Sequence, residues 1–501
     1  MNGSLRHVMV VLLGCFTLLF VQLNRVQILE AESLKDNPAN TRTVQREFNR
    51  PRGDIVTSDG VVVATSVETP GQRFGRQRTY PEGPLYAHSV GFLSFNLGAD
   101  GAEKVFNTEL TGSTAAQQLA DFTSLLDPDP DGGSITLTLD DKLQKVARDA
   151  LGDRPGSVVA LDPRTGAVRA LWSYPSFDPN LLATNDGGAA NTSYQELLNA
   201  DGNPLRAKSY KDREFPGSTF KLITAAAALE SGAATLDEPV FEATSSYTPP
   251  LTTNPITNFS GGPCGGNLTT ILARSCNTPF AKLAAETLGP LVMVNQAEAA
   301  GFNTDVPFDL PGAAVSNYPT DYGKRIQAPT AERPAGLYEN TPKLAQTAIG
   351  QNDVQASPLM MALVAAGVAN DGVIPKPHVL ADVRDATGKV VRTNDGEEWR
   401  MSMRTENARI LQQAMIEAAD RGRTATVDGL RIGVKTGTAQ LGTDPPRSHA
   451  WIVGFGGRPD GEPELVVSVL VEGQEGSVDQ TGGAVAGPIA KALFTEWFNR
   501  G

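Results

Sequence analysis

The apolar and polar positions of the chain predict an N-terminal membrane anchor followed by a long region of strands and helices. Residues 8–21 are apolar apart from two positions, and further apolar residues extend this run to residue 29. A run of this length is near the lower limit for crossing a bilayer and too long for an ordinary buried helix. We therefore predict a single transmembrane anchor over residues 8–29, with residues 1–7 as a short cytoplasmic tail.

The flanks of this run indicate its orientation. Arg6 precedes it and three acidic residues follow within residues 30–36, which favours a cytoplasmic N-terminus and an extracytoplasmic remainder. A cleaved signal peptide is one alternative, but residues 22–25 lack a small-x-small cleavage site. A lipoprotein processing box at Cys15 is another, but the apolar run continues well beyond it. We expect an uncleaved, single-pass protein of the plasma membrane.

Residues 30–150 have the pattern of a non-catalytic module. Two runs rich in β-branched residues, 55–56 and 61–64, flank a Ser-Asp-Gly turn, which predicts a hairpin. Gly-rich loops and short periodic pieces follow, and a cluster of Asp, Pro and Gly at 127–133 is typical of a linker. We interpret this segment as a pedestal or dimerisation-type module that holds the next domain away from the membrane.

Residues 155–500 combine strand and helix periodicities. Two apolar strands at 157–161 and 167–172 flank a turn, and three more strands come near the end of the chain, after a mainly helical insert. This order predicts an α+β domain with a five-stranded antiparallel sheet flanked by helices. The other expected elements are a strand at 134–139, a helix capped by Asp140, helices at 225–229, 268–283, 359–369 and 484–498, and strands at 430–434, 450–455 and 465–471.

Composition narrows the function classes. The formal net charge of -13 and the lack of a basic stripe argue against a nucleic-acid partner. No pair among the three cysteines and four histidines has metal-ligand spacing, so we expect no metal and no cofactor. A Ser/His/Asp triad has no local signature here, and His449, at the start of an apolar strand, fits a core histidine better than a catalytic one.

A candidate nucleophile lies at a predicted helix start. Pro216 and Gly217 interrupt the preceding structure, and Ser218 follows in the first turn. Ser218 and Lys221 are three residues apart, which places them on one helix face within about 5–6 Å. A lysine can take the serine proton only if burial or nearby charge lowers its pKa from about 10.4. The pair alone is a weak signal, because Ser-x-x-Lys should occur about once by chance in a chain of this length.

Two further motifs make the Ser218–Lys221 pair a stronger indication of an active site. Ser275-Cys276-Asn277 follows a helical segment, and Lys435-Thr436-Gly437-Thr438 ends the strand at 430–434. A Ser-x-Asn match is uninformative alone, since Ser94-Phe95-Asn96 matches too, and we interpret that copy as chance. Lys-Thr-Gly-Thr is more specific, because average residue usage predicts it in well under roughly one chain in ten.

In this order, the three motifs resemble the active site of the serine penicillin-recognising enzymes. The resemblance covers residues 155–500, and the stretches 175–180, 348–351 and 451–455 agree with it. The upstream Arg52-Gly53-Asp54-Ile55 resembles the start of a class B penicillin-binding protein, the monofunctional transpeptidase type. The resemblance therefore implies a penicillin-binding/β-lactamase-like transpeptidase fold for this domain.

The resemblance also implies a reaction and a role for each catalytic residue. Ser218 attacks the penultimate D-alanine carbonyl of a D-Ala-D-Ala stem peptide, with Lys221 as general base, and the resulting acyl-enzyme crosslinks peptidoglycan. Ser275 relays the proton towards the leaving amine, while Asn277 holds the substrate amide and orients Lys221. β-Lactams would act as covalent inhibitors of the same serine.

The third motif completes the implied site. The backbone N–H groups of Ser218 and Thr438 form the oxyanion hole. The terminal carboxylate of the substrate binds Lys435, Thr436 and Thr438 through charge-assisted contacts. Gly437 leaves room for the substrate to lie beside the strand.

Two cysteines near the second motif are candidates for a disulfide. Cys264 lies in a Gly-rich segment upstream of Cys276, and outside the cytoplasm two such cysteines can pair. Cys276 should also point away from the groove if Ser275 and Asn277 point into it. We expect a Cys264–Cys276 disulfide, with two free thiols as the alternative.

Other functions would use the same motifs. A D,D-carboxypeptidase differs only in its choice of water as the acceptor. A class A β-lactamase needs a Glu-x-x-Leu-Asn sequence after the second motif, which this chain lacks, and a sensor needs more membrane spans or a signalling segment. A non-catalytic wall-synthesis scaffold, from another functional class, has no need of an intact motif set. The family implies a SEDS-type glycan polymerase as partner, because residues 30–150 offer no glycosyltransferase module.

Overall fold

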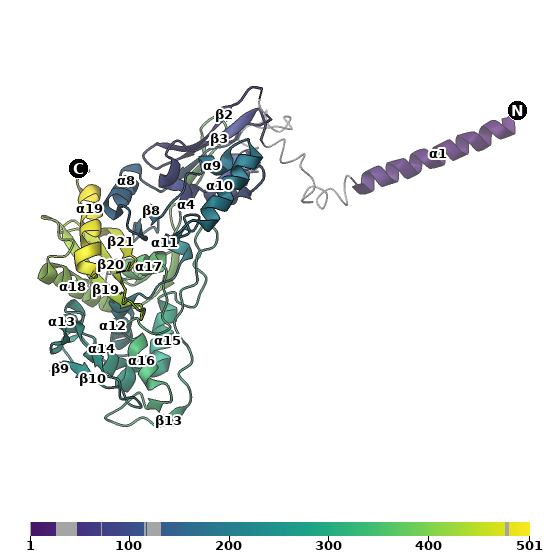
Figure 1. Ribbon diagram of the computed structural model, residues 1–501. Coiled ribbons are helices and arrows are strands. Elements are labelled where there is room, and N and C mark those ends of the chain that lie inside the picture. The colour runs from purple at the N-terminus through teal and green to yellow at the C-terminus, as the bar shows by residue number, and fades with distance from the viewer. Residues whose placement is uncertain are drawn as a thin grey trace.

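The computed structural model of the 501-residue chain describes residues 2–26, 48–71, 73–114, 117, 132–475 and 480–500. Helix α1 (Asn2–Asn24) lies apart from the rest of the described chain (Figure 1). Its stretch Arg6–Asn24 is long and apolar enough to cross a membrane and is not buried against the protein, as expected for most of the anchor. Residues 27–29 of the expected anchor and 127–131 of the expected linker lie outside the described residues.

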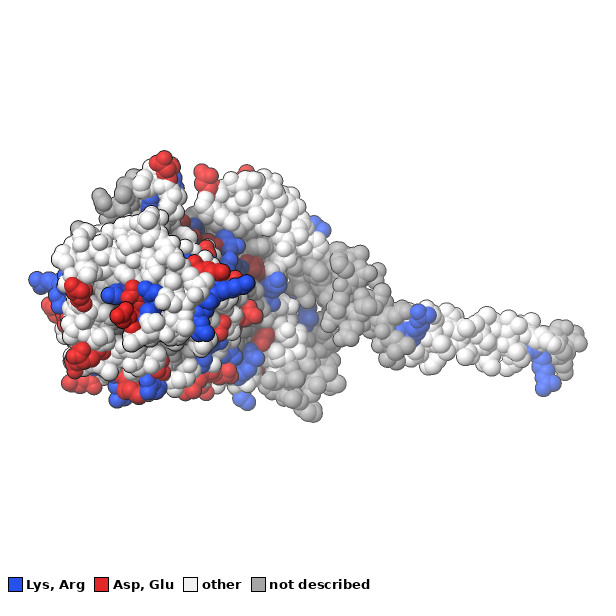
Figure 2. Space-filling view, turned by 90° about the horizontal axis from the view of Figure 1, so that it is seen from below, with Lys and Arg blue, Asp and Glu red and all other residues white. Residues whose placement is uncertain are grey.

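Charged side chains are mixed over the molecular face seen in Figure 2. Acidic and basic groups are interspersed there, and neither sign forms a continuous patch on that face. Helix α1 is almost free of charge along its length in the same view. The apolar surface of the helix therefore contrasts with the mixed charges of the body.

The C-terminal region contains the predicted five-stranded antiparallel sheet, in the order β19-β20-β21-β7-β8. Strand β20 is buried along its whole length, because helices cover both faces of the sheet. Helices α17 and α18 pack on one face, and α8 and α19 pack on the other. Their bounds are β7 (Gly156–Leu161), β8 (Val168–Tyr174), β19 (Arg431–Gln440), β20 (Ser448–Gly457), β21 (Pro463–Val471), α8 (Asp141–Leu151), α17 (Pro358–Ala369), α18 (Thr405–Gly422) and α19 (Gly487–Phe498).

The helical insert lies at one side of this sheet, in the lower part of Figure 1. The helix expected over 268–283 is wrong in one respect, because the chain breaks it between α13 and α14. Ser275 adopts a left-handed backbone with φ of 58°, and Pro279, which has no N–H group to donate, lies in the first turn of the next helix, where no donor is needed. The insert contains α12 (Lys221–Glu230), α13 (Leu268–Ala273), α14 (Thr278–Lys282), α15 (Gly289–Ala299) and α16 (Thr341–Thr347).

A second sheet connects the N-terminal module to the C-terminal region. It has six strands in the order β17-β16-β6-β1-β2-β3, and it includes the predicted hairpin, in which Ile55 pairs with Ala64. The sequence patterns missed β16 and β17, which come from inside residues 155–500. β16 pairs with β6 of the module, and β17 pairs with the other edge of β16. The strands are β1 (Ile55–Val56), β2 (Val62–Glu68), β3 (Arg76–Thr79), β6 (Ile135–Leu137), β16 (Leu380–Arg384) and β17 (Val390–Thr393).

Short elements fill the connections between these layers. Asp140 caps α8 as predicted, since its side chain accepts a hydrogen bond from the N–H group of Leu143 at 2.8 Å. These short elements include η2 (Gly83–Tyr86), α4 (Ala87–Val90), β4 (Leu93–Ser94), β5 (Gly98–Ala99), α5 (Gly101–Val105), α6 (Asn107–Leu110), α9 (Asn180–Ala183), α10 (Gly187–Asn199), α11 (Lys208–Lys211), β9 (Phe241–Thr244), β10 (Ser246–Tyr247), β11 (Ile256–Thr257), β12 (Cys264–Gly266), β13 (Arg325–Gln327), β14 (Leu337–Tyr338), β15 (Val373–Pro375) and β18 (Glu398–Met401).

A buried ionic cluster holds the module together. The Glu103 carboxylate accepts hydrogen bonds from Arg52 Nε at 2.7 Å, from Arg78 Nε at 2.6 Å and from the Tyr80 hydroxyl at 3.2 Å. Burial disfavours the charged carboxylate, but the two arginines outweigh it and hold the pKa of Glu103 below its usual value. The cluster therefore contains a carboxylate whose charge depends on both arginines.

Candidate active site

Ser218 lies in a 3₁₀ turn, η4 (Gly217–Phe220), that leads into α12. The first turn of the expected α-helix is therefore a 3₁₀ turn, and the α-helix itself begins at Lys221. The three neighbours of Ser218 within this turn are buried, whereas Ser218 itself is partly exposed. The serine side chain is thus the part of the turn that a ligand can reach.

Backbone contacts fix this turn from two sides. The N–H group of Gly217 donates to Gly350 O at 3.0 Å, and a Cβ atom on Gly350 would lie 2.1 Å from Gly217 O. A Cβ atom on Gly217 would lie 2.7 Å from Thr438 O in β19. The turn is therefore pressed between the loop at Gly350 and the strand that carries the third motif.

Lys221 is a buried lysine directed at the second motif. Its Nζ atom donates to Asn277 Oδ1 at 2.6 Å and to Ser275 O at 2.7 Å, and it lies 3.4 Å from Ser275 Oγ. Burial, and secondarily the nearby charge of Lys435, lower the pKa of Lys221 well below its usual value. The surroundings of the side chain therefore favour the neutral amine over the charged form.

Lys435 reaches the same serine from the sheet. Its Nζ atom donates to Ser275 Oγ at 2.8 Å and to Thr436 O at 2.8 Å. Burial lowers the pKa of Lys435 to about 7. The Ser275 hydroxyl thus lies between two desolvated lysine amines, one from α12 and one from β19.

Ser218 does not pair with Lys221 in the way that the spacing predicts. In the part of the chain that the structure describes, no hydrogen bond joins the Ser218 hydroxyl to another group. Lys221 instead donates to the second motif. The structure brings the two residues together through the turn η4 and α12 and leaves the serine hydroxyl available to a ligand, a common condition of unliganded sites.

The second motif occupies the tight connection between α13 and α14. Cys276 is buried, and its sulfur is bonded to that of Cys264, with 5.6 Å between the two Cα atoms. Asn277 Nδ2 donates to Thr257 O at 2.8 Å. An amide nitrogen has two hydrogens, and the hydrogen bonds of this nitrogen within the described part of the chain use only one of them.

The third motif lies inside a strand and not at its end. The strand expected over 430–434 continues as β19 to Gln440, and Lys435 pairs with Val453 of β20. β19 is the last strand of the sheet, so its outer edge carries N–H and C=O groups that no neighbouring strand of the described sheet satisfies. An extended peptide can add to such an edge.

Gly437 packs against the nucleophile turn, and its expected role of leaving room for substrate stays a prediction. A Cβ atom at this position would lie 2.9 Å from Pro216 O and 3.0 Å from Thr219 Cγ2. The place that a Cβ atom of residue 437 would take is therefore filled by the nucleophile turn. The glycine lets β19 approach that turn closely.

His449 behaves as the predicted core histidine. It is buried, its Nδ1 atom accepts the N–H group of Gly473 at 3.0 Å, and its Nε2 atom lies 2.9 Å from a Glu214 carboxylate oxygen. Both ring nitrogens thus have partners. The pair connects β20 to the segment that leads into Ser218.

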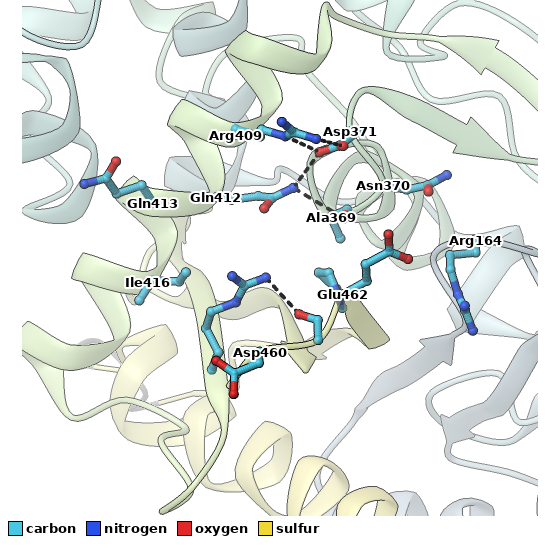
Figure 3. Close-up of a pocket in the computed structure, with 13 residues that line it drawn as sticks. Arg164, Ala369, Asn370, Asp371, Arg409, Gln412, Gln413, Ile416, Asp460 and Glu462 are labelled. Carbon is cyan, nitrogen blue, oxygen red and sulfur yellow. Dashed lines mark hydrogen bonds and ion pairs between the residues drawn. The ribbon is translucent and has the colours of Figure 1, made fainter. Parts of the chain in front are cut away.

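A separate pocket of about 570 Å³ lies between the start of α18 and the β20–β21 turn (Figure 3). Arg409 forms an ion pair with Asp371 at 2.7 Å, and Arg431 donates a hydrogen bond to Gly461 O at 3.2 Å. None of the motif residues lines it. Among the described residues, no group of His, Cys, Asp or Glu gathers as a metal site either.

Together, an accessible serine, two desolvated lysines and a free strand edge define an acyl-transfer site of the penicillin-binding class. The chain belongs to this family, since the family profile "Penicillin binding protein transpeptidase domain" matches residues 156–495. A second profile, "Penicillin binding protein A dimerisation domain", matches residues 52–135. The chain is a class B penicillin-binding protein, as the sequence resemblance predicted.

Full-length relatives identify the branch of the family. The peptidoglycan D,D-transpeptidase PbpA of Mycolicibacterium smegmatis is 35% identical over 100% of both chains, and PbpA of Mycobacterium tuberculosis is 34% identical over 99% of this chain and 98% of its own. The structure of penicillin-binding protein A from M. tuberculosis as a ceftriaxone acyl-enzyme complex matches with a TM-score of 0.79 and 32% identity, covering 90% of this chain and 99% of that one. The penicillin G acyl-enzyme complex of the same protein matches with a TM-score of 0.77 and 32% identity, covering 90% of this chain and 100% of that one.

Sequence reasoning missed two residues that hold the second motif. Asn258 accepts hydrogen bonds from the N–H groups of Asn277 and Thr278, and Thr257 accepts from the Asn277 side chain. Nothing around residues 257–258 forms a recognisable motif. A lone asparagine far from the motif in sequence offers no signal before the fold is known.

Proposed function

We propose that this protein is a peptidoglycan D,D-transpeptidase that crosslinks stem peptides through an acyl-enzyme on Ser218, and that β-lactams inhibit it by acylating the same serine. The observation that carries the proposal is the convergence of Lys221 and Lys435 on Ser275, beside an accessible serine turn. This arrangement offers a nucleophile, a neutral amine base and a proton relay within one groove. The named relatives carry out or are described with the same chemistry.

In the acylation step, Ser218 Oγ attacks the carbonyl carbon of the penultimate D-alanine. Lys221, whose burial lowers its pKa and favours the neutral amine, takes the hydroxyl proton. The C–N bond to the terminal D-alanine then breaks, and the proton passes through Ser275 to the leaving amine. The hydrogen-bonded chain from Lys221 through Ser275 to Lys435 supports this route.

Backbone donors would stabilise the tetrahedral intermediate. The N–H groups of Ser218 and Thr438 belong to two segments in direct contact, since Gly217 packs against Thr438 O. Loss of one such donor typically costs about 2.7–4 kcal/mol of transition-state stabilisation. The contact between the turn and β19 thus fixes the spacing of the two donors.

Substrate binding would use the edge of β19 and the second motif. Lys435 in its charged form, with the hydroxyls of Thr436 and Thr438, would hold the terminal carboxylate of the substrate. The remaining N–H of the Asn277 amide would donate to a peptide carbonyl. Among the described residues, no acidic side chain pairs with Lys221 or Lys435, which favours an anionic ligand.

In the second step, the amine of an acceptor stem peptide attacks the acyl-enzyme and restores Ser218. If water attacks instead, the protein is a D,D-carboxypeptidase, the alternative with the same site. We further propose that α1 anchors the protein once in the plasma membrane with the catalytic domain outside the cytoplasm. The absence of a glycosyltransferase signature in residues 30–150 supports a SEDS-type polymerase as partner.

The test is labelling of the full-length protein with a fluorescent penicillin. We expect wild type to label covalently and Ser218→Ala not to label. Ser94→Ala is a matched control, because Ser94 lies in the chance copy of the second motif and is buried, and its hydroxyl has no hydrogen-bond partner among the described residues. Equal labelling of wild type and Ser218→Ala, or labelling of neither, contradicts the proposal.

The acceptor is tested by partitioning of the acyl-enzyme. We expect an amine acceptor, such as a D-amino acid, to capture the acyl group of a thioester substrate faster than water does. Exclusive hydrolysis at saturating amine would favour the carboxypeptidase.

A further inference from the structure

Asn258 is a buried asparagine with every polar atom of its side chain in use. It lies between β11 (Ile256–Thr257) and β12 (Cys264–Gly266), and it is 6% exposed. Its Oδ1 atom accepts the N–H groups of Asn277 at 2.9 Å and of Thr278 at 3.0 Å. Its Nδ2 atom donates to Thr244 O at 2.7 Å and to Gly262 O at 3.0 Å.

We propose that Asn258 is a positioning residue for the transpeptidase reaction, which holds the second motif in register with Lys221. The path is short: Asn258 fixes the backbone of Asn277, and the Asn277 side chain in turn accepts from Lys221 Nζ at 2.6 Å. Asn258 touches neither the reacting atoms nor the substrate. It acts only through the residues that do.

The backbone of the second motif needs such support. Ser275 has a left-handed φ of 58°, a conformation that is strained for a residue with a side chain and persists only where the surroundings impose it. Three ties from one short segment impose it here. They are the Asn258 amide, the Thr257 carbonyl that accepts from Asn277, and the disulfide from Cys264 to Cys276.

An asparagine fits this position because the site needs donors and acceptors on the same group. The oxygen faces two N–H groups, and the nitrogen faces two carbonyl groups. An aspartate keeps the acceptor towards Asn277 but loses the donor towards Thr244 and Gly262. An alanine loses both sides.

These differences separate positioning from plain stability. The inference rests on the proposed function, so the experiment measures the second-order rate of acylation by a fluorescent penicillin on the full-length protein, well below its melting temperature. We compare wild type, Asn258→Ala, Asn258→Asp and Asn258→Ser with Asn180→Ala. Asn180 is a matched control, because it also binds one backbone N–H and one carbonyl, both of Tyr80, in another part of the fold.

We expect Asn258→Ala to acylate about 100-fold more slowly, as for a misplacement of roughly 1 Å in a catalytic group. Asn258→Asp should keep acylation within about tenfold of wild type, since its oxygen still accepts from the Asn277 N–H group, while its melting temperature falls. Asn180→Ala should lose melting temperature and keep the wild-type acylation rate.

Acylation by Asn258→Ala within twofold of Asn180→Ala, or equal loss in Asn258→Asp and Asn258→Ala, overturns the inference. If Asn258→Ala does not fold, Asn258→Ser takes its place. The serine side chain is shorter, so its hydroxyl reaches the two N–H groups poorly and the same loss of acylation rate is expected. Absence of label at Ser218 in wild type would instead contradict the proposed function itself.

Discussion

At the scale of single residues, the site depends on two lysines without acidic partners among the described residues. Lys221 donates its hydrogen bonds to groups of the second motif, and Lys435 shares Ser275 with it. Burial lowers the pKa of both lysines, and the charge of Lys435 lowers the pKa of Lys221 further. In the proposed mechanism Lys221 acts as the base and Lys435 binds a carboxylate.

The lowered pKa of Lys435 predicts how the acylation rate depends on pH. In the free enzyme Lys435 is charged below pH about 7 and neutral above it, so its contact with an anionic ligand is present at lower pH and lost as the pH rises. We expect the second-order acylation rate to fall on the alkaline side with this pKa. Lys435→Arg should move that alkaline limb to higher pH, because a guanidinium stays charged, even if its maximum is lower.

The measurement is the acylation rate of each protein from mildly acidic to alkaline pH. An alkaline limb at the same pH in wild type and Lys435→Arg would contradict the assignment of this limb to Lys435.

At the scale of elements, the nucleophile turn is a junction of three segments. Turn η4 contacts the loop at Gly350 on one side and β19 on the other, and neither contact tolerates a Cβ atom. The close approach explains why glycines stand at 217, 350 and 437. The position of Ser218 is thus set by packing between segments distant in sequence.

Gly350→Ala should therefore damage both stability and acylation. The new Cβ atom would lie 2.1 Å from Gly217 O, at a backbone φ of 72° that disfavours a side chain. We expect a loss of about 1–3 kcal/mol in the free energy of unfolding, typical of overpacking, and slower acylation because Ser218 shifts.

Gly232→Ala is the control for backbone strain alone. Gly232 has a φ of 73°, and no described atom lies within 4 Å of the place that an added Cβ atom would take. Thermal melts and penicillin labelling of both variants check the expectation. Equal acylation by the two variants would contradict a role for the Gly350 contact.

The same scale shows what sequence patterns can predict. The hairpin β7–β8 and the strands β20 and β21 were predictable, because they are apolar runs bounded by turns. Strand β17 has no buried residue in its pattern, so no periodicity reveals it. The role of Asn258 is even harder to predict from sequence, because it depends on contacts with residues about twenty positions away. The three motifs were readable because their chemistry fixes their residue types.

At the scale of the whole molecule, a substitution in the Glu103 cluster measures how much the module contributes to stability. Glu103→Gln removes the charge between Arg52 and Arg78 and leaves both arginines buried without this counterion. We expect a loss of about 3–5 kcal/mol in the free energy of unfolding, as for other broken buried pairs. Labelling of Ser218 in the folded variant should be unchanged.

Glu68→Gln is the matched control, because Glu68 pairs with Arg76 at 3.0 Å on the surface, where an ion pair contributes about 0–1 kcal/mol. Thermal or denaturant unfolding of full-length variants provides the comparison. Similar losses in Glu103→Gln and Glu68→Gln would contradict the importance of the buried cluster.

The sheet that pairs β6 with β16 has a practical consequence for work with fragments. A protein cut at residue 156, where the transpeptidase family profile begins, would keep β16 and β17 but lose the four strands beside them. The exposed edge of β16 would then offer unpaired backbone groups to other copies, a common cause of aggregation. We therefore expect a fragment that begins at residue 156 to aggregate, and a fragment that begins before Phe48, ahead of the first strand, to stay soluble.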